Sequence, residues 1–378
     1  MGEKEMLSQE EELLLKAIKN KAPIAGLTHD FFPYPARFPP SIPRYFISNF
    51  SSPKDLILDP FCGSGTTLVE ASILERNSVG IDLNPLAVFL SKVKTTPISV
   101  RDLKENYWTI YRKFNSIIHG QLTLHHLRKE DFEFDEEKLF SSKEKKLIRP
   151  NVRKEILCLY EITSQLQHGI REFYLTCLAS SCNILADRKG LERKSIKTIF
   201  FSKAKCMIDG MNEYNMQRKN VSIKIYEDNA ENVRKYLFPE SVDLVVTSPP
   251  YHEIHVEYPY LLLKGRQVSK LFLKIFGLKT EVSSSDYTMK KGQTYFSLFE
   301  KCLKGIVETL KTGRKAIIVV GFKTAESHED FVNICLRNNL ILERKYDREI
   351  PSRKWFTSLE EKKEKVIPKE YVFIFRKV

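Results

Sequence analysis

The stretch DLILDPFCGSGTTLVEASILE, residues 55–75, decides the fold. Its residues 56–58 are apolar and come directly before an Asp-Pro pair, as expected of a short buried strand. TTLVEASILE has apolar residues at helical spacing. Between these two segments, Gly63 and Gly65 permit a tight turn in which the backbone can approach a ligand closely. A strand, a glycine turn and a helix in this order predict the opening unit of a doubly wound α/β sheet, with a ligand at the carboxyl end of the strand.

The alternation of strands and helices continues in two separated parts of the chain. SVGIDLNP predicts a second strand that ends at Asp82, and LAVFLSKVKT predicts the helix after it. Residues 101–220 contain charged amphipathic segments, which we interpret as a mostly helical insertion. The Pro-rich connector at residues 29–43 is expected to be extended. After the insertion we predict strands in VSIKIYE, SVDLVVT and RKAIIVVGF, a short helix in NVRKYLF, a longer helix stopped by Gly313, and a closing antiparallel pair in LILERKYDREI and EYVFIFRKV.

The composition favours a folded protein with a polyanionic partner. Hydrophobic residues make up 42% of the chain, and 61 Lys and Arg against 48 acids give a net charge of +13. A positive charge of this size favours nucleic acid through contacts with phosphates. The seven cysteines form no CxxC pair and no His is spaced to complete a zinc site, so we predict no metal, and reduced thiols in the cytoplasm. No segment approaches the length of a membrane span, and the sequence indicates no particular oligomeric state.

Two motifs resemble those of a known enzyme family. The glycine turn lacks the GxGxxG spacing of a dinucleotide site and the Gly-Lys-Ser/Thr ending of a P-loop, which leaves a nucleoside cofactor without phosphates. DPFCGSGTT, residues 59–67, resembles the first motif of the amino-group DNA methyltransferases, which use S-adenosylmethionine, and TSPPY, residues 247–251, resembles their catalytic motif. The resemblance covers residues 28–95 and 221–320. It implies a class I methyltransferase fold, which is Rossmann-like and doubly wound, with a mostly parallel seven-stranded sheet and one reversed strand near the end.

The resemblance also divides the chain into three parts. Residues 1–100 would form the N-terminal part of the catalytic methyltransferase domain, residues 101–220 the helical insertion, and residues 221–378 the C-terminal part with the SPPY motif and the closing hairpin. The insertion is either a substrate-recognition element or additional scaffold. The cofactor loop precedes SPPY, whereas many cytosine-N4 enzymes have the reverse order, so the insertion, the loop from His252 to His255 and the basic LKGRQVSK stretch all stay candidates for target recognition.

The resemblance implies how S-adenosylmethionine is held. The turn at Gly63 and Gly65 would wrap its methionine part, and Asp82 would accept both ribose hydroxyls at the end of its strand. Asp228 or its neighbour Asn229 would read the adenine amino group, and both stay open. The two threonines after the turn are expected to cap the following helix. The predicted cofactor contacts are Phe38, Pro39, Asp59, Pro60, Phe61, Gly63, Gly65, Thr66, Asp82, Leu83, Asp228 and Asn229.

The residue types of TSPPY suit methyl transfer to an exocyclic amino group. Such a nitrogen is a poor nucleophile because its lone pair is conjugated into the ring. Ser248 Oγ and the Pro249 carbonyl would grip its hydrogens and free the lone pair for in-line attack, while Tyr251 would stack on an extruded base. The serine that opens SPPY resembles the cytosine-N4 enzymes, whereas adenine-N6 enzymes more often carry Asp or Asn. The predicted catalytic residues are Ser248, Pro249, Pro250 and Tyr251.

We therefore predict cytosine-N4 methylation of DNA in the modification half of a restriction or defence system. Lys264, Arg266 and Lys270 follow SPPY and are predicted to contact phosphates, although a solvated helix face would carry the same charges. Three alternatives stay open: a cytosine-N4 methyltransferase acting on structured RNA such as rRNA, an adenine-N6 DNA methyltransferase, and a catalytically idle subunit that binds nucleic acid.

Overall fold

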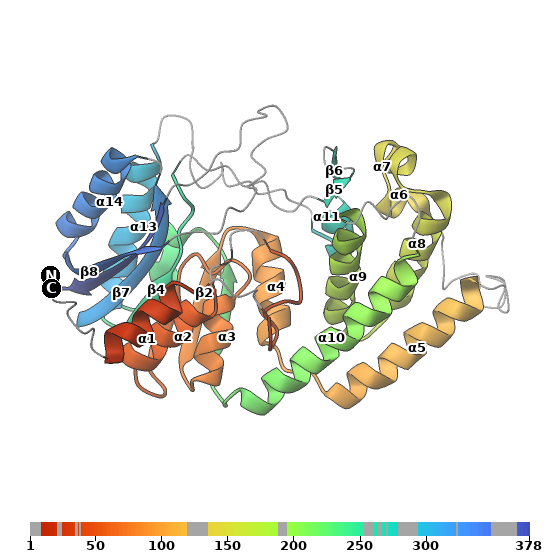
Figure 1. Ribbon diagram of the computed structural model, residues 1–378, viewed down its shortest axis with the longest axis horizontal. Helices are drawn as coiled ribbons and strands as arrows, with labels where there is room; N and C mark the ends of the chain where they lie inside the picture. The colour runs from red at the N-terminus through yellow and green to blue at the C-terminus, as the bar shows by residue number, and fades with distance from the viewer. Residues whose placement is uncertain are drawn as a thin grey trace, which may run out of the picture.

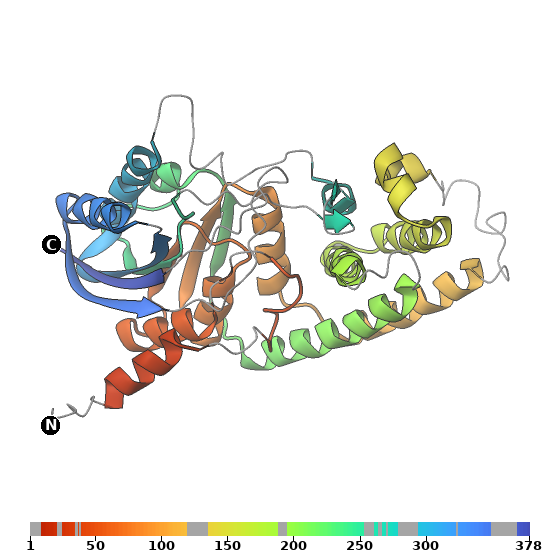
Figure 2. The same cartoon turned by 45° about the horizontal axis from the view of Figure 1, so that its top comes forward.

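A computed structural model describes most of the chain. Figure 1 shows a sheet covered by helices in one half of the molecule and a block of helices in the other half. The long helix α10 (Ile196–Gln217) runs from the helical block to the sheet in both views (Figures 1 and 2). The described residues are 9–20, 25–34, 37, 39–118, 135–187, 195–252, 261–263, 267–269, 271–278, 294–322, 324–348 and 369–378.

Seven strands form one sheet, and their order confirms the predicted class I methyltransferase fold. The first five strands in spatial order are parallel to one another. β9 is antiparallel to both of its neighbours, β7 and β8, so it is the single reversed strand predicted near the end of the chain. The strands in spatial order are β3 (Ile223–Glu227), β2 (Asn77–Asp82), β1 (Leu56–Asp59), β4 (Val242–Thr247), β7 (Leu310–Phe322), β9 (Lys369–Lys377) and β8 (Leu340–Arg348).

Helices bury both faces of the central strands. Alternate residues of a strand point to opposite sides, so Ile57 and Leu244 pack into one core while their neighbours Leu58 and Val245 pack into another. The first face is covered by α1 (Gln9–Ile18), α2 (Ser41–Phe50) and α3 (Thr66–Ile73), and the second by the 3₁₀ helix η2 (Ala230–Lys235), α13 (Tyr295–Thr309) and α14 (Ala325–Arg337). The carboxyl ends of the parallel strands are left for a ligand.

The helical block shares one continuous hydrophobic core with α4 (Pro85–Thr95) and with the turns at residues 27–34. A small hairpin and α11 (Leu271–Phe276) come from the later part of the chain but pack here: Phe272 contacts Phe32 edge to face at 5.3 Å. The remaining elements of the block are α5 (Val100–Ile118), α6 (Glu136–Leu139), α7 (Ser142–Leu147), α8 (Pro150–Ser164), α9 (Ile170–Asp187), β5 (Leu261–Leu263) and β6 (Gln267–Ser269).

The Pro-rich connector is not extended throughout, which corrects the sequence prediction. Residues 26–32 form turns, and α2 begins at Ser41 inside the connector. Pro40 is its N-cap residue with φ −56°, and Pro43 lies in its first turn. A helix tolerates proline there because the N–H groups of the first turn have no partner within the helix.

Two further local predictions were wrong, and a third was confirmed with a different helix type. Gly65 with φ +80° is the N-cap of α3 and no side chain caps this helix, because the two threonines lie inside its first turn and are buried. The short helix predicted in NVRKYLF is present in part as the 3₁₀ helix η2, which ends at Lys235. Gly313 does not stop α13, which ends at Thr309, because pairing between β7 and β4 already begins at Leu310. Gly313 lies within β7 with φ +78°, where the register with β4 shifts.

Candidate cofactor and catalytic site

The parallel strands bring the acidic and SPPY residues to one edge of the sheet. Asp59 ends β1, Asp82 ends β2, and Asp228 directly follows β3. Ser248 directly follows β4, which pairs with β1. Because β3, β2, β1 and β4 are adjacent and parallel, these four residues line a continuous row at the carboxyl edge. Residues far apart in the sequence thus form a single site.

Asp82 holds the glycine turn in place. Its Oδ2 accepts a hydrogen bond from the Gly63 N–H at 2.8 Å, and its Oδ1 accepts one from the Asn84 N–H at 2.9 Å. Asp82 is buried, and Gly63 has φ +49°, in the left-handed region that favours glycine. The turn is therefore shaped by the neighbouring strand before any ligand binds.

Asp59 is a buried carboxylate with one unused oxygen. Its Oδ1 accepts hydrogen bonds from Thr247 Oγ at 2.7 Å and from the Phe61 N–H at 3.2 Å. Its Oδ2 has no hydrogen-bond partner among the described residues. Burial raises the pKa of Asp59 to about 6, and the nearby Asp82 carboxylate also raises it. A cationic ligand group beside Oδ2 would compensate this charge.

Asp228 and Asn229 both have local structural contacts. The Asp228 carboxylate accepts hydrogen bonds from the Asn229 N–H, from Asn232 Nδ2 and from the Tyr236 hydroxyl, each at 2.7 Å. Burial would raise the pKa of Asp228, but these hydrogen bonds lower it overall. Asn229 caps η2 by accepting a hydrogen bond from the Glu231 N–H at 3.1 Å. These contacts fix both residues at the tip of β3.

The SPPY segment is held from two directions. The Tyr295 hydroxyl of α13 donates a hydrogen bond to the Pro250 carbonyl at 2.7 Å. The Tyr251 hydroxyl donates one to the Glu370 carboxylate of β9, which is paired with the buried Arg348 of β8. Burial, together with the Glu370 charge, raises the pKa of Tyr251 well above its ordinary value. The hydroxyl is therefore a stable donor, and the half-buried ring has a fixed orientation.

Comparisons with known proteins agree with this geometry. A family model described as DNA methylase, for N6 and N4 amino groups, matches residues 9–92, which contain the glycine turn and Asp82. The type II methyltransferase M.MvaI of Kocuria varians is 26% identical over 298 residues, 71% of this chain and 62% of that protein. M.BsoBI of Geobacillus stearothermophilus is 24% identical over 342 residues, 80% of this chain and 65% of that protein.

One shorter match has a higher sequence identity. M.MjaII of Methanocaldococcus jannaschii is 38% identical over 77 residues, 20% of this chain and 14% of that protein. The chain thus aligns with less than two thirds of the length of each of these relatives. These matches support its membership in an S-adenosylmethionine-dependent amino-methyltransferase family.

The residues of the site fit S-adenosylmethionine, the cofactor of this family. The methionine part of the cofactor carries cationic groups, and the unused, buried Asp59 Oδ2 is an acceptor for such a group. A side chain at Gly65 would not fit, since a Cβ atom there would lie only 2.9 Å from Ser91 Oγ, so the turn packs closely against α4. The described residues contain no group of three or more His, Cys, Asp or Glu side chains that could hold a metal ion. No described helix is long and apolar enough to cross a membrane.

The other predicted site residues are placed as follows. Pro60 and Phe61 continue from β1 into the turn, Thr66 is the first residue of α3, and Leu83 lies between β2 and α4. Pro39 is buried, and its carbonyl accepts a hydrogen bond from the Ile42 N–H at the start of α2. Phe38, Lys264, Arg266 and Lys270 lie outside the described residues, as does His255.

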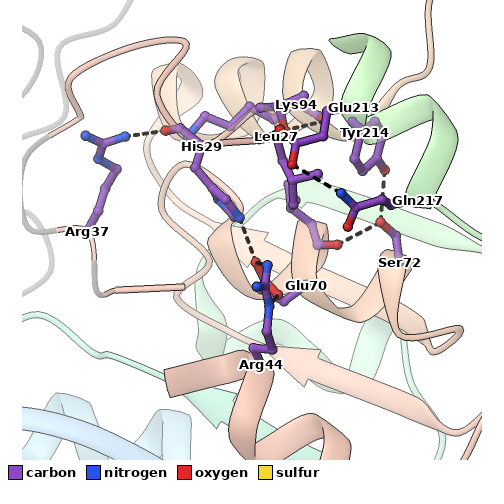
Figure 3. A network of polar contacts seen from close by, with 12 residues as sticks. Leu27, His29, Arg37, Arg44, Glu70, Ser72, Lys94, Glu213, Tyr214 and Gln217 are labelled. Carbon is purple, nitrogen blue, oxygen red and sulfur yellow. Dashed lines mark hydrogen bonds and ion pairs between the residues drawn. The ribbon is translucent and has the colours of Figure 1, made fainter. Parts of the chain in front are cut away.

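Sequence reasoning missed a polar network around the buried Glu70 side chain. Figure 3 shows His29 pointing toward Glu70 of α3, which also binds Arg44 of α2. The His29 Nε2 to Glu70 Oε1 distance is 2.7 Å, and the Arg44 Nε to Glu70 Oε2 distance is 2.6 Å. Burial lowers the pKa of His29. One signal was present in the sequence: Glu70 is the single charged residue of TTLVEASI, in a helix otherwise suited to burial.

Proposed function

We propose that this chain methylates the N4 amino group of cytosine in DNA, as the modification enzyme of a type II restriction system in the cytoplasm. The observation that supports this most is the 2.7 Å hydrogen bond from Thr247 Oγ to Asp59 Oδ1. It joins the residue directly before Ser248 to the residue that opens the cofactor loop. The names of the relatives, all type II methyltransferases, support DNA as the polymer.

Each group of residues has a separate task in this proposal. S-adenosylmethionine supplies an electrophilic methyl group on a sulfonium when it is bound. Gly63, Gly65 and Asp59 line its methionine part, and Asp82 and the residues at the tip of β3 bind its nucleoside. The SPPY segment, one strand away on β4, holds the base. The Thr247 to Asp59 hydrogen bond holds the cofactor loop and the SPPY segment in a fixed position relative to each other.

Ser248 and Pro249 activate the amino nitrogen by orientation. Ser248 Oγ and the Pro249 carbonyl accept its two hydrogens, which draws the nitrogen toward tetrahedral geometry and frees its lone pair. The next carbonyl, that of Pro250, already accepts a hydrogen bond from the Tyr295 hydroxyl. Tyr251 supports the extruded base with a ring that Glu370 keeps in orientation. Ser248, in place of Asp or Asn, supports cytosine over adenine as the base.

A methyl-transfer assay tests the proposal. The enzyme is incubated with methyl-labelled S-adenosylmethionine and either unmethylated duplex DNA or total RNA, and the products are digested and separated by nucleoside mass spectrometry. We expect label in N4-methylcytosine from DNA. Label in N6-methyladenine would overturn the choice of base. Label in RNA but not in DNA would overturn the choice of polymer, and no transfer together with no cofactor binding would indicate the idle subunit.

The pKa of Asp59 predicts how cofactor affinity changes with pH. Asp59 must be ionised to compensate a cationic ligand group, and its pKa is about 6. The ionised fraction, and with it the affinity for S-adenosylmethionine, is therefore expected to fall about tenfold from about pH 8 to about pH 5. Calorimetric titration across this range measures the effect. Asp59→Asn, which cannot ionise, should bind weakly without this slope, and a flat profile for the unmodified enzyme would rule out the role of Asp59.

A further inference from the structure

Helix α4 supports the cofactor loop from behind through two polar side chains. Ser91 and Lys94 are three residues apart and therefore lie on one face of α4. Ser91 Oγ donates a hydrogen bond to the Gly63 carbonyl at 2.8 Å. Lys94 Nζ donates one to Ser64 Oγ at 2.9 Å. The Ser64 side chain thus points toward α4, and the opposite side of the turn is left to face a ligand.

Lys94 is an unusual residue for such a position. It is 0% exposed, and within the described part of the chain Ser64 Oγ is the hydrogen-bond partner of its Nζ. Burial holds the pKa of Lys94 well below its ordinary value, and Arg37 lowers it further. A buried amine with so few partners costs stability, and an apolar side chain of the same length would avoid this cost. Packing alone does not explain a lysine here.

The contacts of the loop show what Lys94 adds. Asp82 fixes the Gly63 N–H from the β2 side, and Ser91 fixes the Gly63 carbonyl from the α4 side. The side chain of Ser64, the residue between the two glycines, is fixed by Lys94. A glycine on each side of Ser64 gives this turn a wide choice of backbone conformations unless it is held. A turn that is already held loses less conformational entropy when a ligand binds.

We propose that Lys94 is a positioning residue for S-adenosylmethionine: through its hydrogen bond to Ser64 it holds the Gly63–Gly65 turn in the conformation that binds the cofactor. Lys94 acts through Ser64 and does not touch the cofactor itself. The inference concerns cofactor binding alone, so it stands or falls independently of the base and the polymer that are methylated.

Lys94→Met tests the proposal because cofactor affinity should fall without any fall in stability. Methionine keeps an unbranched side chain but has no amine. We expect affinity for S-adenosylhomocysteine, measured by calorimetry, to fall about tenfold, which corresponds to about 1.4 kcal/mol. We expect the Tm of the ligand-free protein to stay the same or rise. Lys92→Met, the same change at an exposed position of α4, is the matched control and should alter neither quantity.

A second variant separates positioning from a general structural role. Ser64→Ala removes the partner of Lys94, so it should weaken binding to the same extent and lower the Tm, because the buried amine is left unpaired. The double variant should bind no more weakly than either single variant and melt above Ser64→Ala. Unchanged binding by Lys94→Met, a fall of Tm and affinity together, or additive losses in the double variant would each overturn the proposal.

Discussion

Ser248→Ala is expected to lower turnover about a hundredfold to a thousandfold, the usual cost of removing one polar group that acts in the transition state. The serine hydroxyl is one of two acceptors proposed for the hydrogens of the amino group. Without it, the nitrogen keeps its conjugated lone pair. Single-turnover kinetics with unmethylated duplex DNA measure the effect directly, because they exclude product release.

Cofactor affinity should stay unchanged in the same variant. The cofactor loop is linked to β4 through Thr247, which donates to Asp59, and not through Ser248. Ser241→Ala at the opposite end of β4 is a matched control: the Ser241 hydroxyl bonds the Phe238 carbonyl, far from the site, and its loss should change neither turnover nor binding. An equal loss of cofactor binding in Ser248→Ala would contradict the proposed division of roles.

The sequence predicted the central sheet because hydrophobic pattern and turn chemistry agree there. The β1, glycine turn and α3 unit is specified within residues 55–75, and the acids at the strand ends follow from parallel pairing. The prediction failed where tertiary contacts decide. The connector becomes helical at Ser41 because α2 can bury Ile42 and Phe46 against the sheet, which no local pattern in a Pro-rich stretch reveals.

The contacts that hold the site could not be predicted because they join distant parts of the chain. Thr247 and Asp59 are 188 positions apart, and Tyr251 and Glu370 are 119 apart. A motif gives the residue types at the edge of the sheet, but only the strand order places β9 beside β7 and brings Glu370 to the same edge. The Lys94 to Ser64 contact was hidden for another reason: a lysine in a helix usually faces solvent.

The second large effect is expected for Asp82→Ala. In contrast to Ser248→Ala, this variant should lose cofactor affinity and keep its turnover. Alanine removes two acceptors that hold backbone N–H groups, those of Gly63 and Asn84, and also the proposed acceptor of the ribose hydroxyls. A hydrogen bond to a charged group contributes about 1.5–3 kcal/mol, so the loss of more than one should weaken S-adenosylmethionine binding at least about a hundredfold. Turnover at saturating cofactor should stay close to that of the unmodified enzyme.

Asp243→Ala is the matched control that separates affinity from stability in this experiment. Asp243 is also buried and also accepts a backbone N–H, that of Leu56 at 2.9 Å, but it lies near the amino end of β4, away from the site. Both variants should melt at lower temperature than the unmodified protein, because each leaves a backbone N–H without its acceptor, and Asp243→Ala also removes the ion pairs of Asp243 with Lys311 and Arg314. Only Asp82→Ala should lose cofactor affinity, measured by calorimetry below both melting temperatures. If Asp243→Ala lost as much affinity, the effect would be one of general stability, and the assignment of Asp82 to the cofactor would have to be withdrawn.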